Sequence, residues 1–471
     1  MARNTIDKRD SSKPGCLSYQ QHQLWFLNHL APVNVAYTCG YAMTIRGPLN
    51  PAAFSRAIDS VFARQELLRT RFISVDGHPV PEVATKYAGT LKHVDLRSFA
   101  ADERLDTANQ LVKRHACLPY DLSRDLPMRT LLIRITDEEF VFAYFPHHIV
   151  WELRSTPIFF HELKLAYETE VFGETASLPE MPIQYADYAV WQREWLTGPK
   201  LDALQEYWRG RLAGAPSKLN IRTDRPHPPI QTYEGARYPV TLPDSVRRSV
   251  DSFCEENGTS SFRVLCAAFQ LMLSHYSGQQ HISVGTPIIP VLPREIEPII
   301  GMFAQTVVVD TQLSDSMSFR QLAMQVSDTV TKAIRRALPF DLIVSAVQPP
   351  RDPSRMVLFQ SNFRVVKSPL AALDIRGLSA TPPEWVDTDT SKFDLSMELV
   401  ADGGPGGFLE YRTDLFDRAT MAGLASDYIA LLSAAIAQPD IPIMKFEPAS
   451  ALSKRLKGLR MSRRNRIPVL I

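Results

Sequence analysis

The chain has few cysteines and no close pair of them. Its 471 residues contain five, at positions 16, 39, 117, 254 and 266, an odd number that is widely scattered. Without a Cys-x-x-Cys pair, neither a structural zinc site nor a disulfide framework is indicated. We therefore expect a protein of a reducing compartment, by default the cytoplasm, that has no structural metal.

The sequence also lacks an excess of either charge and has no long apolar run. The 52 basic and 51 acidic residues leave a net charge of +1, and no basic stripe with interleaved aromatics argues for nucleic-acid binding. The first 15 residues, MARNTIDKRDSSKPG, have no apolar signal core, and no stretch approaches a membrane span. The 45% hydrophobic and 22% charged residues are typical of a globular protein. We predict a monomer that binds neither nucleic acid nor membrane.

The length predicts more than one core, with two domains of roughly 200 residues as the natural division. Strand and helix patterns mix in both halves, which indicates an α/β (α+β) fold. A proline-rich polar stretch at 213–229 is the best candidate linker. The predicted parts are a flexible N-terminus (1–14), an N-terminal lobe (15–180), a connecting helix and linker (181–229), a C-terminal lobe (230–445) and a basic tail (446–471).

The tail carries seven basic residues and no acid between Lys454 and Arg466. It is interpreted as a solvated terminus or, alternatively, as a docking segment for an acidic partner.

Hydrophobic periodicity and turn residues predict the main elements. Helices are expected over 17–30, 50–62, 102–115, 155–172, 185–196, 244–257, 260–276, 319–336 and 417–436. Strands are expected over 41–45, 129–135, 140–146, 238–242, 282–285, 300–309 and 357–366, with a late hairpin over 394–400 and 408–412.

A pair of histidines ends the strand predicted over 140–146. Because consecutive strand residues point to opposite faces, one of His147 and His148 is expected to be buried while the other faces a cleft. That geometry disfavours a metal shared by both with Glu152. Two interpretations remain: a structural pair, or a general base, since a neutral imidazole is near its working pKa at neutral pH.

Nine stretches resemble, in order, the motifs of the condensation domains of nonribosomal peptide synthetases. Together they cover about residues 15 to 440, and it is their order that makes the resemblance specific. They are LSYQQHQLWFL (17–27), RQELLRTRF (64–72), HHIVWEL (147–153), YADYAVWQ (185–192), IGMFAQT (300–306), PFDLIV (339–344), RDPSRMVLFQ (351–360), KFDLSMEL (392–399) and LEYRTDLF (409–416).

The resemblance implies a V-shaped pseudo-dimer of two lobes, each similar to chloramphenicol acetyltransferase, with a central tunnel. It implies acyl transfer from a thioester on the phosphopantetheine arm of an acyl or peptidyl carrier protein to an amine or hydroxyl acceptor, forming an amide or an ester. His148, the second histidine of the family's HHxxxDG motif, would deprotonate or orient the nucleophile, with His147 in support. The protein would need no cofactor or metal of its own, because the arm belongs to the partner.

Several positions depart from the family pattern. Glu152 replaces the motif's aspartate and Leu153 its glycine, while Gln23 and Gln305 replace an arginine and an asparagine. In the family the aspartate pairs with an arginine, for which Arg64 and Arg69 are the candidates here. Glutamate keeps the charge, but its extra methylene shifts the loop, and Leu153 adds bulk near the reacting centre.

For other candidate residues, a structural role is considered beside a functional role. Trp151 either packs the loop or contacts substrate, and Ser391 and Gln305 are substrate-contact candidates that only the resemblance suggests. Asp352 and Arg355 are expected in a polar network within one domain. Separately, Tyr185, Tyr188 and Trp191 are expected to pack in the core or join the lobes.

Two rival functions remain open. An epimerisation domain of the same superfamily also carries paired histidines, and a catalytically silent platform would recruit partner enzymes. A heterocyclising domain is disfavoured because that family replaces the histidine pair with aspartates. No adenylation domain and no phosphopantetheine attachment site are visible, so the chain is interpreted as free-standing or as part of a larger synthetase.

Overall fold

The chain folds into two compact units, each built from three stretches. The computed structural model describes residues 5–10, 12, 15–87, 89–173, 178–366, 372–401 and 407–448. Unit 1 comprises Met1–Asp202, Ile289–Ala304 and Pro369–Thr388, and unit 2 comprises Ala203–Ile288, Gln305–Ser368 and Asp389–Ile471. Two stretches expected in the C-terminal lobe thus group with unit 1, because their hydrogen bonds are made there. The basic run from 454 to 466 lies outside the described residues.

Unit 1 is built on a mixed sheet with the order β11-β1-β6-β5-β4, in which β12 also pairs with β1. The strands β5 and β6 form an antiparallel hairpin that places Met128 opposite Pro146, whereas β4 and β5 run parallel. The bounds are β1 Gly40–Arg46, β4 Leu91–Asp95, β5 Met128–Arg134, β6 Glu139–Pro146, β11 Ser379–Ala380 and β12 Glu384–Val386. The hairpin predicted from the sequence is confirmed.

Residues of β6 are buried on both faces of this sheet, because successive side chains of a strand point to opposite faces. On one face, Phe142 meets the ring of Phe54 edge-on at 5.1 Å, beneath the paired helices α2 (Pro51–Arg64) and α4 (Ser155–Phe172). On the other face, Val141, Ala143 and Phe145 form a cluster with α3 (Arg104–Ala116). A strand buried on both sides explains the unbroken apolar run that precedes the histidines.

Local sequence sets several helix ends in unit 1. The Asn50 side chain accepts hydrogen bonds from the first-turn amides of α2, and Gly173 ends α4 in the left-handed conformation, with φ of 67°. The remaining elements of the unit are α1 Tyr19–Leu30, the 3₁₀ helix η1 Glu66–Arg69, β2 Thr70–Val75, β3 His78–Val83, α5 Tyr185–Trp195, the start of α6 (Gly198–Arg211) and η2 Arg294–Ile296.

Part of the N-terminal stretch expected to be flexible is anchored to α5. Ile6 is buried, and the backbone amide of Arg9 donates to Asp187 at 3.0 Å. The Arg9 guanidinium also pairs with Asp187 at 3.6 Å. The polar composition of this segment gave no sign in the sequence of the buried Ile6 or of the partly buried ion pair between Arg9 and Asp187.

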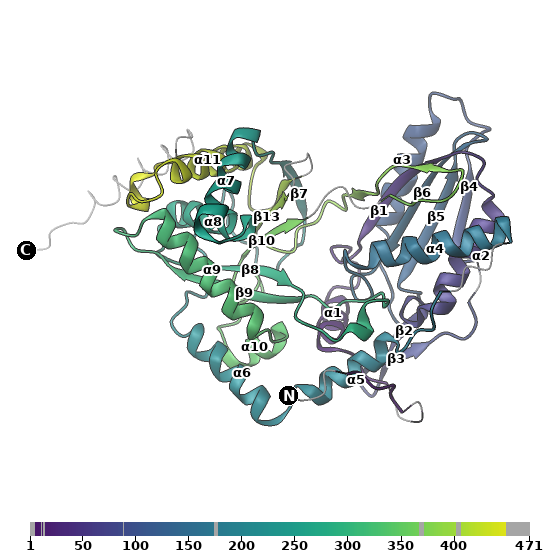
Figure 1. Ribbon diagram of the computed structural model, residues 1–471, viewed down its shortest axis with the longest axis horizontal. Helices are drawn as coiled ribbons and strands as arrows, with labels where there is room; N and C mark the ends of the chain where they lie inside the picture. Colours follow the sequence, from purple (N-terminus) through teal and green to yellow (C-terminus); the bar gives the residue numbers. More distant parts are fainter. Residues whose placement is uncertain are drawn as a thin grey trace, which may run out of the picture. The chain divides into compact units, whose positions relative to one another are not determined.

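Unit 2 has a six-stranded sheet with the order β7-β14-β13-β10-β8-β9. Figure 1 shows the helices α7, α8, α9 and α11 next to this sheet. Buried apolar side chains of these helices and of the sheet form one continuous core. The bounds are β7 Gly235–Pro239, α7 Asp244–Asn257, α8 Ser261–Ser277, β8 His281–Ile288, β9 Gln305–Gln312, α9 Phe319–Arg335, α10 Phe340–Val347, β10 Ser361–Val366, β13 Leu395–Val400, β14 Phe408–Arg412, α11 Arg418–Ala437 and η3 Ile443–Lys445.

One helix of unit 2 is long and apolar enough to cross a membrane by length and composition. That helix, α11, packs against α7, α8, β7 and β14, and half of its apolar window is buried. Its apolar residues therefore serve the core, as those of many packed core helices do.

Candidate functional site

The two histidines follow β6 and differ in burial, as the sequence predicted. His147 forms an isolated bridge with Thr38, is 2% exposed, and its Nδ1 accepts a hydrogen bond from the amide of Ile149 at 3.1 Å. The ring of Tyr120 packs edge-on against the His147 ring at 5.7 Å. His147 is therefore a buried, structural part of the loop.

His148 is partly exposed, and its ring is held by its own loop. Its backbone amide donates to the carbonyl of Tyr37 at 2.8 Å, and its Nδ1 lies 2.6 Å from the carbonyl oxygen of Trp151. A carbonyl only accepts, so Nδ1 carries the proton in this contact. In the neutral ring the lone pair then lies on Nε2, which is the form a general base requires.

The Glu152 carboxylate is buried and binds backbone amides. Its Oε2 accepts from the amides of Phe303 at 3.2 Å and Ala304 at 2.8 Å, and its Oε1 lies 3.5 Å from Nε of Arg154. Burial raises the pKa of Glu152 above its ordinary value, against the lowering effect of these donors. The carboxylate thus ties the histidine loop to the segment 289–304.

Arg154 reinforces the same connection. Its terminal nitrogens donate to the carbonyls of Ile296, Glu297 and Ile299 at 2.9 to 3.3 Å. Its guanidinium also lies 4.7 Å from the centre of the Phe303 ring. Sequence reasoning missed Arg154, although an arginine directly after the motif was a visible signal.

The expectation that Arg64 or Arg69 pairs with Glu152 is wrong. Arg64 pairs with Glu162 on α4 at 2.9 Å, and Arg69 donates to backbone carbonyls, including that of Ala84 at 3.0 Å. Glu152 instead pairs with Arg154 in its own loop and accepts hydrogen bonds from the amides of Phe303 and Ala304.

The strand predicted over 300–309 begins only at Gln305, where β9 starts. Before that point, side chains take up the backbone amides: Gln65 accepts from Ile300 at 3.1 Å, and Ser155 accepts from Gly301 at 3.3 Å. The amides of Phe303 and Ala304 are bound to Glu152. The segment therefore cannot contribute them to the hydrogen-bond ladder of a sheet.

Gly301 is required by a close approach. A Cβ atom at this position would lie 2.1 Å from the ring of Tyr185, which is buried on α5. The rings of Tyr185 and Tyr188 lie 5.1 and 4.8 Å from that of Phe303. These two tyrosines thus pack on this segment within unit 1, as core residues. Trp191 is half-buried, and its ring lies 5.9 Å from that of Tyr188 within α5.

The two neighbours of Glu152 have different environments. Trp151 is fully buried and packs edge-on against Phe159 at 5.7 Å, so its loop-packing interpretation is confirmed. Leu153 is 38% exposed, and it is not among the non-glycine residues with positive φ in the described chain. The loop therefore adopts its conformation without the freedom of glycine.

Ser391 and Gln305 lie in unit 2. Ser391 is fully buried, and its hydroxyl donates to the carbonyl of Phe393 at 2.7 Å. Gln305, the first residue of β9, is 7% exposed, and its Oε1 is buried without a hydrogen-bond partner. Ser391 thus has a structural contact, whereas Gln305 keeps an unused acceptor.

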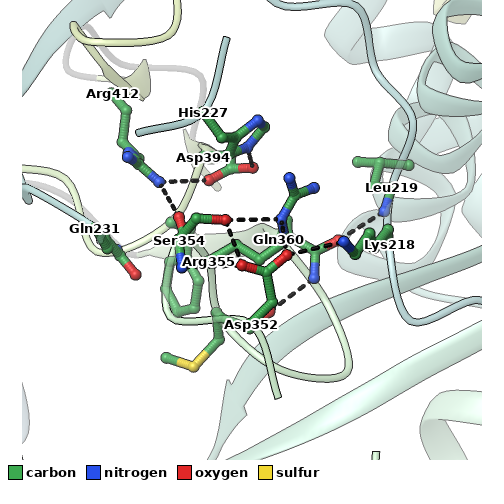
Figure 2. Close-up of polar contacts among 12 residues, drawn as sticks. Lys218, Leu219, His227, Gln231, Asp352, Ser354, Arg355, Gln360, Asp394 and Arg412 are labelled. Atoms are coloured by element: carbon green, nitrogen blue, oxygen red, sulfur yellow. Dashed lines mark hydrogen bonds and ion pairs between the residues drawn. The ribbon is translucent and has the colours of Figure 1, made fainter. Parts of the chain in front are cut away.

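A polar cluster in unit 2 contains the predicted Asp352 and Arg355 pair (Figure 2). Asp352 pairs with Arg355 at 3.2 Å and with Lys218 at 2.9 Å. Hydrogen bonds from Ser354, and then from Lys218, hold the pKa of Asp352 well below its usual range. The predicted network within one domain is confirmed.

Next to it, Arg412 is completely buried and binds two carboxylates (Figure 2). Its guanidinium pairs with Asp394 at 3.2 Å and with Asp414 at 2.6 Å, while Asp394 also meets His227 Nε2 at 2.8 Å. Every charge in this group has a partner, which is the condition for burying it. The cluster is structural.

No metal centre is visible in the part of the chain that the structure describes. Its residues contain no group of three His, Cys, Asp or Glu side chains placed to hold an ion. At the histidine loop, the Glu152 carboxylate faces backbone amides and Arg154, which are donors rather than co-ligands.

Comparison with known proteins agrees with the resemblance in the sequence. The family model described as the condensation domain matches residues 14–456. A linear gramicidin synthase of Brevibacillus parabrevis is 37% identical over 427 residues, or 90% of this chain. The chain spans only 8% of the length of that relative.

Solved structures share the fold over nearly the whole chain. The X-domain from teicoplanin biosynthesis has a TM-score of 0.85 at 24% identity, covering 94% of this chain and 99% of the other. The first condensation domain of the calcium-dependent antibiotic synthetase has a TM-score of 0.76 at 17% identity, covering 93% and 100%. The expected α/β class and the similarity to chloramphenicol acetyltransferase are thereby confirmed.

Proposed function

The chain belongs to the condensation domain family of nonribosomal peptide synthetases, and from that membership we propose that it transfers an acyl group from a carrier-bound thioester to an amine or hydroxyl acceptor. The observation that carries the proposal is the contact between His148 Nδ1 and the Trp151 carbonyl. In the neutral ring this contact places the lone pair on Nε2, the nitrogen that accepts a proton in the proposed reaction.

In the proposed reaction, the acceptor nitrogen or oxygen attacks the thioester carbonyl carbon while His148 Nε2 accepts or orients its proton. The new C–N or C–O bond forms, the C–S bond breaks, and the proton passes to the departing thiolate. The phosphopantetheine arm that carries the sulfur belongs to the carrier partner. No covalent intermediate on the protein is needed, so positioning and electrostatics supply much of the rate.

Glu152 and Arg154 act on this chemistry through the loop. They bind the segment 289–304 and so fix the turn that carries His148. Because the hydrogen bonds of Glu152 and Arg154 are mostly buried, they hold the loop that carries His148 in one conformation. We propose that Glu152 replaces the family's aspartate in this positioning role.

The test is intact-protein mass spectrometry of an acyl-loaded carrier incubated with the full chain and a panel of amines and alcohols. We expect the carrier to lose its acyl group and a condensed product to appear, and we expect His148→Ala to abolish both. His78→Ala replaces an exposed histidine on β3 and serves as the matched control, with unchanged turnover expected.

Other outcomes identify the rival functions. Inversion of a carrier-bound aminoacyl centre without any change of mass indicates an epimerisation domain, which chiral analysis of the released residue detects. Carrier binding without turnover for any acceptor indicates a silent platform. Equal turnover by the wild type and His148→Ala contradicts the assigned role of His148.

A further inference from the structure

A basic groove in unit 1 is not used by the proposed reaction. It has a volume of about 480 Å³ and lies where β4 forms one edge of the sheet, between the β2 strand and the loop that leads into β5. Its lining contains four cations and one acid: Arg71, Lys86, Lys92, Arg129 and Asp125. All of them belong to unit 1.

The cations of the groove are not neutralised by the protein. In the part of the chain that the structure describes, none of the four forms an ion pair, and the Nε atoms of Arg71 and Arg129 are buried without a hydrogen-bond partner. Asp125 accepts from the backbone amide of Asp121 at 3.0 Å. The lining carries a net charge of +3, from four positive and one negative side chain.

Arg129 is held in place without using its full donor set. Its guanidinium lies 3.8 Å from the centre of the Tyr120 ring, and its terminal nitrogens donate to the carbonyls of Leu118 at 2.5 Å and Pro119 at 3.5 Å. The ring and the carbonyl fix the plane of the group. Both acceptors are neutral carbonyls, so no carboxylate of the described chain matches the charge of Arg129, and a guanidinium held in this way is suited to binding an anion.

The smaller cavity of unit 2 provides a contrast. It has a volume of about 180 Å³ and is also lined by cations, including Lys218 and Arg355, but Asp352 pairs with both of these. A positive lining therefore does not by itself leave unmatched charge in this protein. The groove of unit 1 differs because none of its four cations pairs with a carboxylate among the described residues.

We propose that the groove of unit 1 binds a phosphate group, as a monoester or a diester. Guanidinium groups match the oxygens of phosphate with two parallel hydrogen bonds, and two nearby lysines add charge without geometric demands. The volume exceeds that of the phosphate alone and leaves room for the group attached to it. Tyr87 in the lining offers that group an aromatic surface.

Two sources carry such a phosphate: a soluble phosphate compound and the phosphodiester of a carrier's phosphopantetheine arm. The second source rests on the proposed function, while the first does not. Titration of the full chain by calorimetry at low salt separates them, with inorganic pyrophosphate, phosphopantetheine and phosphate-free pantetheine as the probes. Since no turnover is required, a failure here leaves the acyl-transfer proposal untouched.

We expect pyrophosphate, phosphopantetheine or both to bind, and pantetheine not to bind. Binding of phosphopantetheine favours the arm as the source, whereas binding of pyrophosphate alone favours a soluble ligand. Arg71→Gln and Arg129→Gln should each weaken binding by about tenfold, the value of one charged hydrogen bond. Arg124→Gln is the control, because Arg124 lies in the same loop, is 85% exposed and already pairs with Asp121.

Lys92→Gln provides a second variant, because Lys92 is exposed on β4 and its replacement leaves the fold intact. We expect weaker binding and a smaller dependence on salt. The proposal is overturned if no phosphate probe binds the wild type, if pantetheine binds equally well, or if the groove variants bind like Arg124→Gln.

Discussion

His148 and Trp151 are joined by a hydrogen bond that closes the turn after β6, with Nδ1 2.6 Å from the carbonyl oxygen. His147, one residue earlier, turns inward and accepts from the amide of Ile149. These adjacent histidines therefore have separate duties: His147 stabilises the loop, while His148 is assigned the proton transfer of the proposed reaction. Substitutions should separate these duties.

We predict that His147→Ala lowers the free energy of unfolding by about 1 to 3 kcal/mol, because the buried amide of Ile149 loses its acceptor. His148→Ala should lower it by less than about 1 kcal/mol, because the ring is partly exposed. Urea denaturation followed by tryptophan fluorescence measures both. Equal losses in the two variants would contradict the division of duties.

Arg154→Met should destabilise unit 1 by about 3 kcal/mol, because Glu152 keeps a buried charge without its cationic partner. The loss should include weaker protection of the amides of Phe303 and Ala304 in hydrogen exchange. Arg46→Met removes an exposed ion pair with Glu139 and should cost less than about 1 kcal/mol. If exchange at residues 303 and 304 is unchanged in Arg154→Met, Arg154 does not hold the segment.

Gly301→Ala should destabilise the protein by about 1 to 3 kcal/mol, because its Cβ would overlap the Tyr185 ring and force the segment to shift. Gly210→Ala is the matched control: nothing lies within 4 Å of its added Cβ in α6. There the higher helix propensity of alanine should raise stability by up to about 1 kcal/mol. Thermal unfolding compares the two, and similar melting temperatures would refute the contact argument.

The buried carboxylate predicts a pH effect. Since burial raises the pKa of Glu152 above the ordinary 4.5, the folded chain keeps a proton that the unfolded chain releases as pH rises through that region. Stability from this group therefore falls with rising pH, starting near 4.5 and ending above the raised pKa, with a slope of at most about 1.4 kcal/mol per pH unit.

Glu152→Gln removes this titration. As pH rises above 4.5, the unfolding free energy of the wild type should therefore fall relative to that of the variant. Urea denaturation at a series of pH values from below 4.5 upward measures this change. A shift in the opposite direction would mean that Arg154 and the two amides lower the pKa more than burial raises it.

Much of the fold could be predicted because the signals are local. The β5–β6 hairpin, the helix from Ser155 to its glycine stop at 173, and α7 over 244–257 follow from periodicity and cap residues. The helix α6 was missed because its apolar residues are sparse and only Trp208 is buried. The edge strands β11 and β12 were missed because each has three residues or fewer.

The partners of the candidate site could not be predicted, because they are distant in sequence. Glu152 binds the amides of residues 303 and 304, and a backbone amide leaves no mark on the residue types. The same contacts moved the start of β9 to Gln305, although the apolar run begins earlier. Burial of His147 was predictable from strand alternation, whereas the tautomer of His148 required the position of a carbonyl.

The segment 289–304 also sets an order of events during protein synthesis. Residues 1–202 leave the ribosome first, with the histidine turn complete in sequence. The amides that bind Glu152 lie about 150 residues after Glu152 and are made later. Until then Glu152 has Arg154 beside it but lacks its two amide donors, and the turn cannot reach its final geometry. Translation must therefore pass well into the second unit before the first can mature, so the two units emerge as one interdependent product.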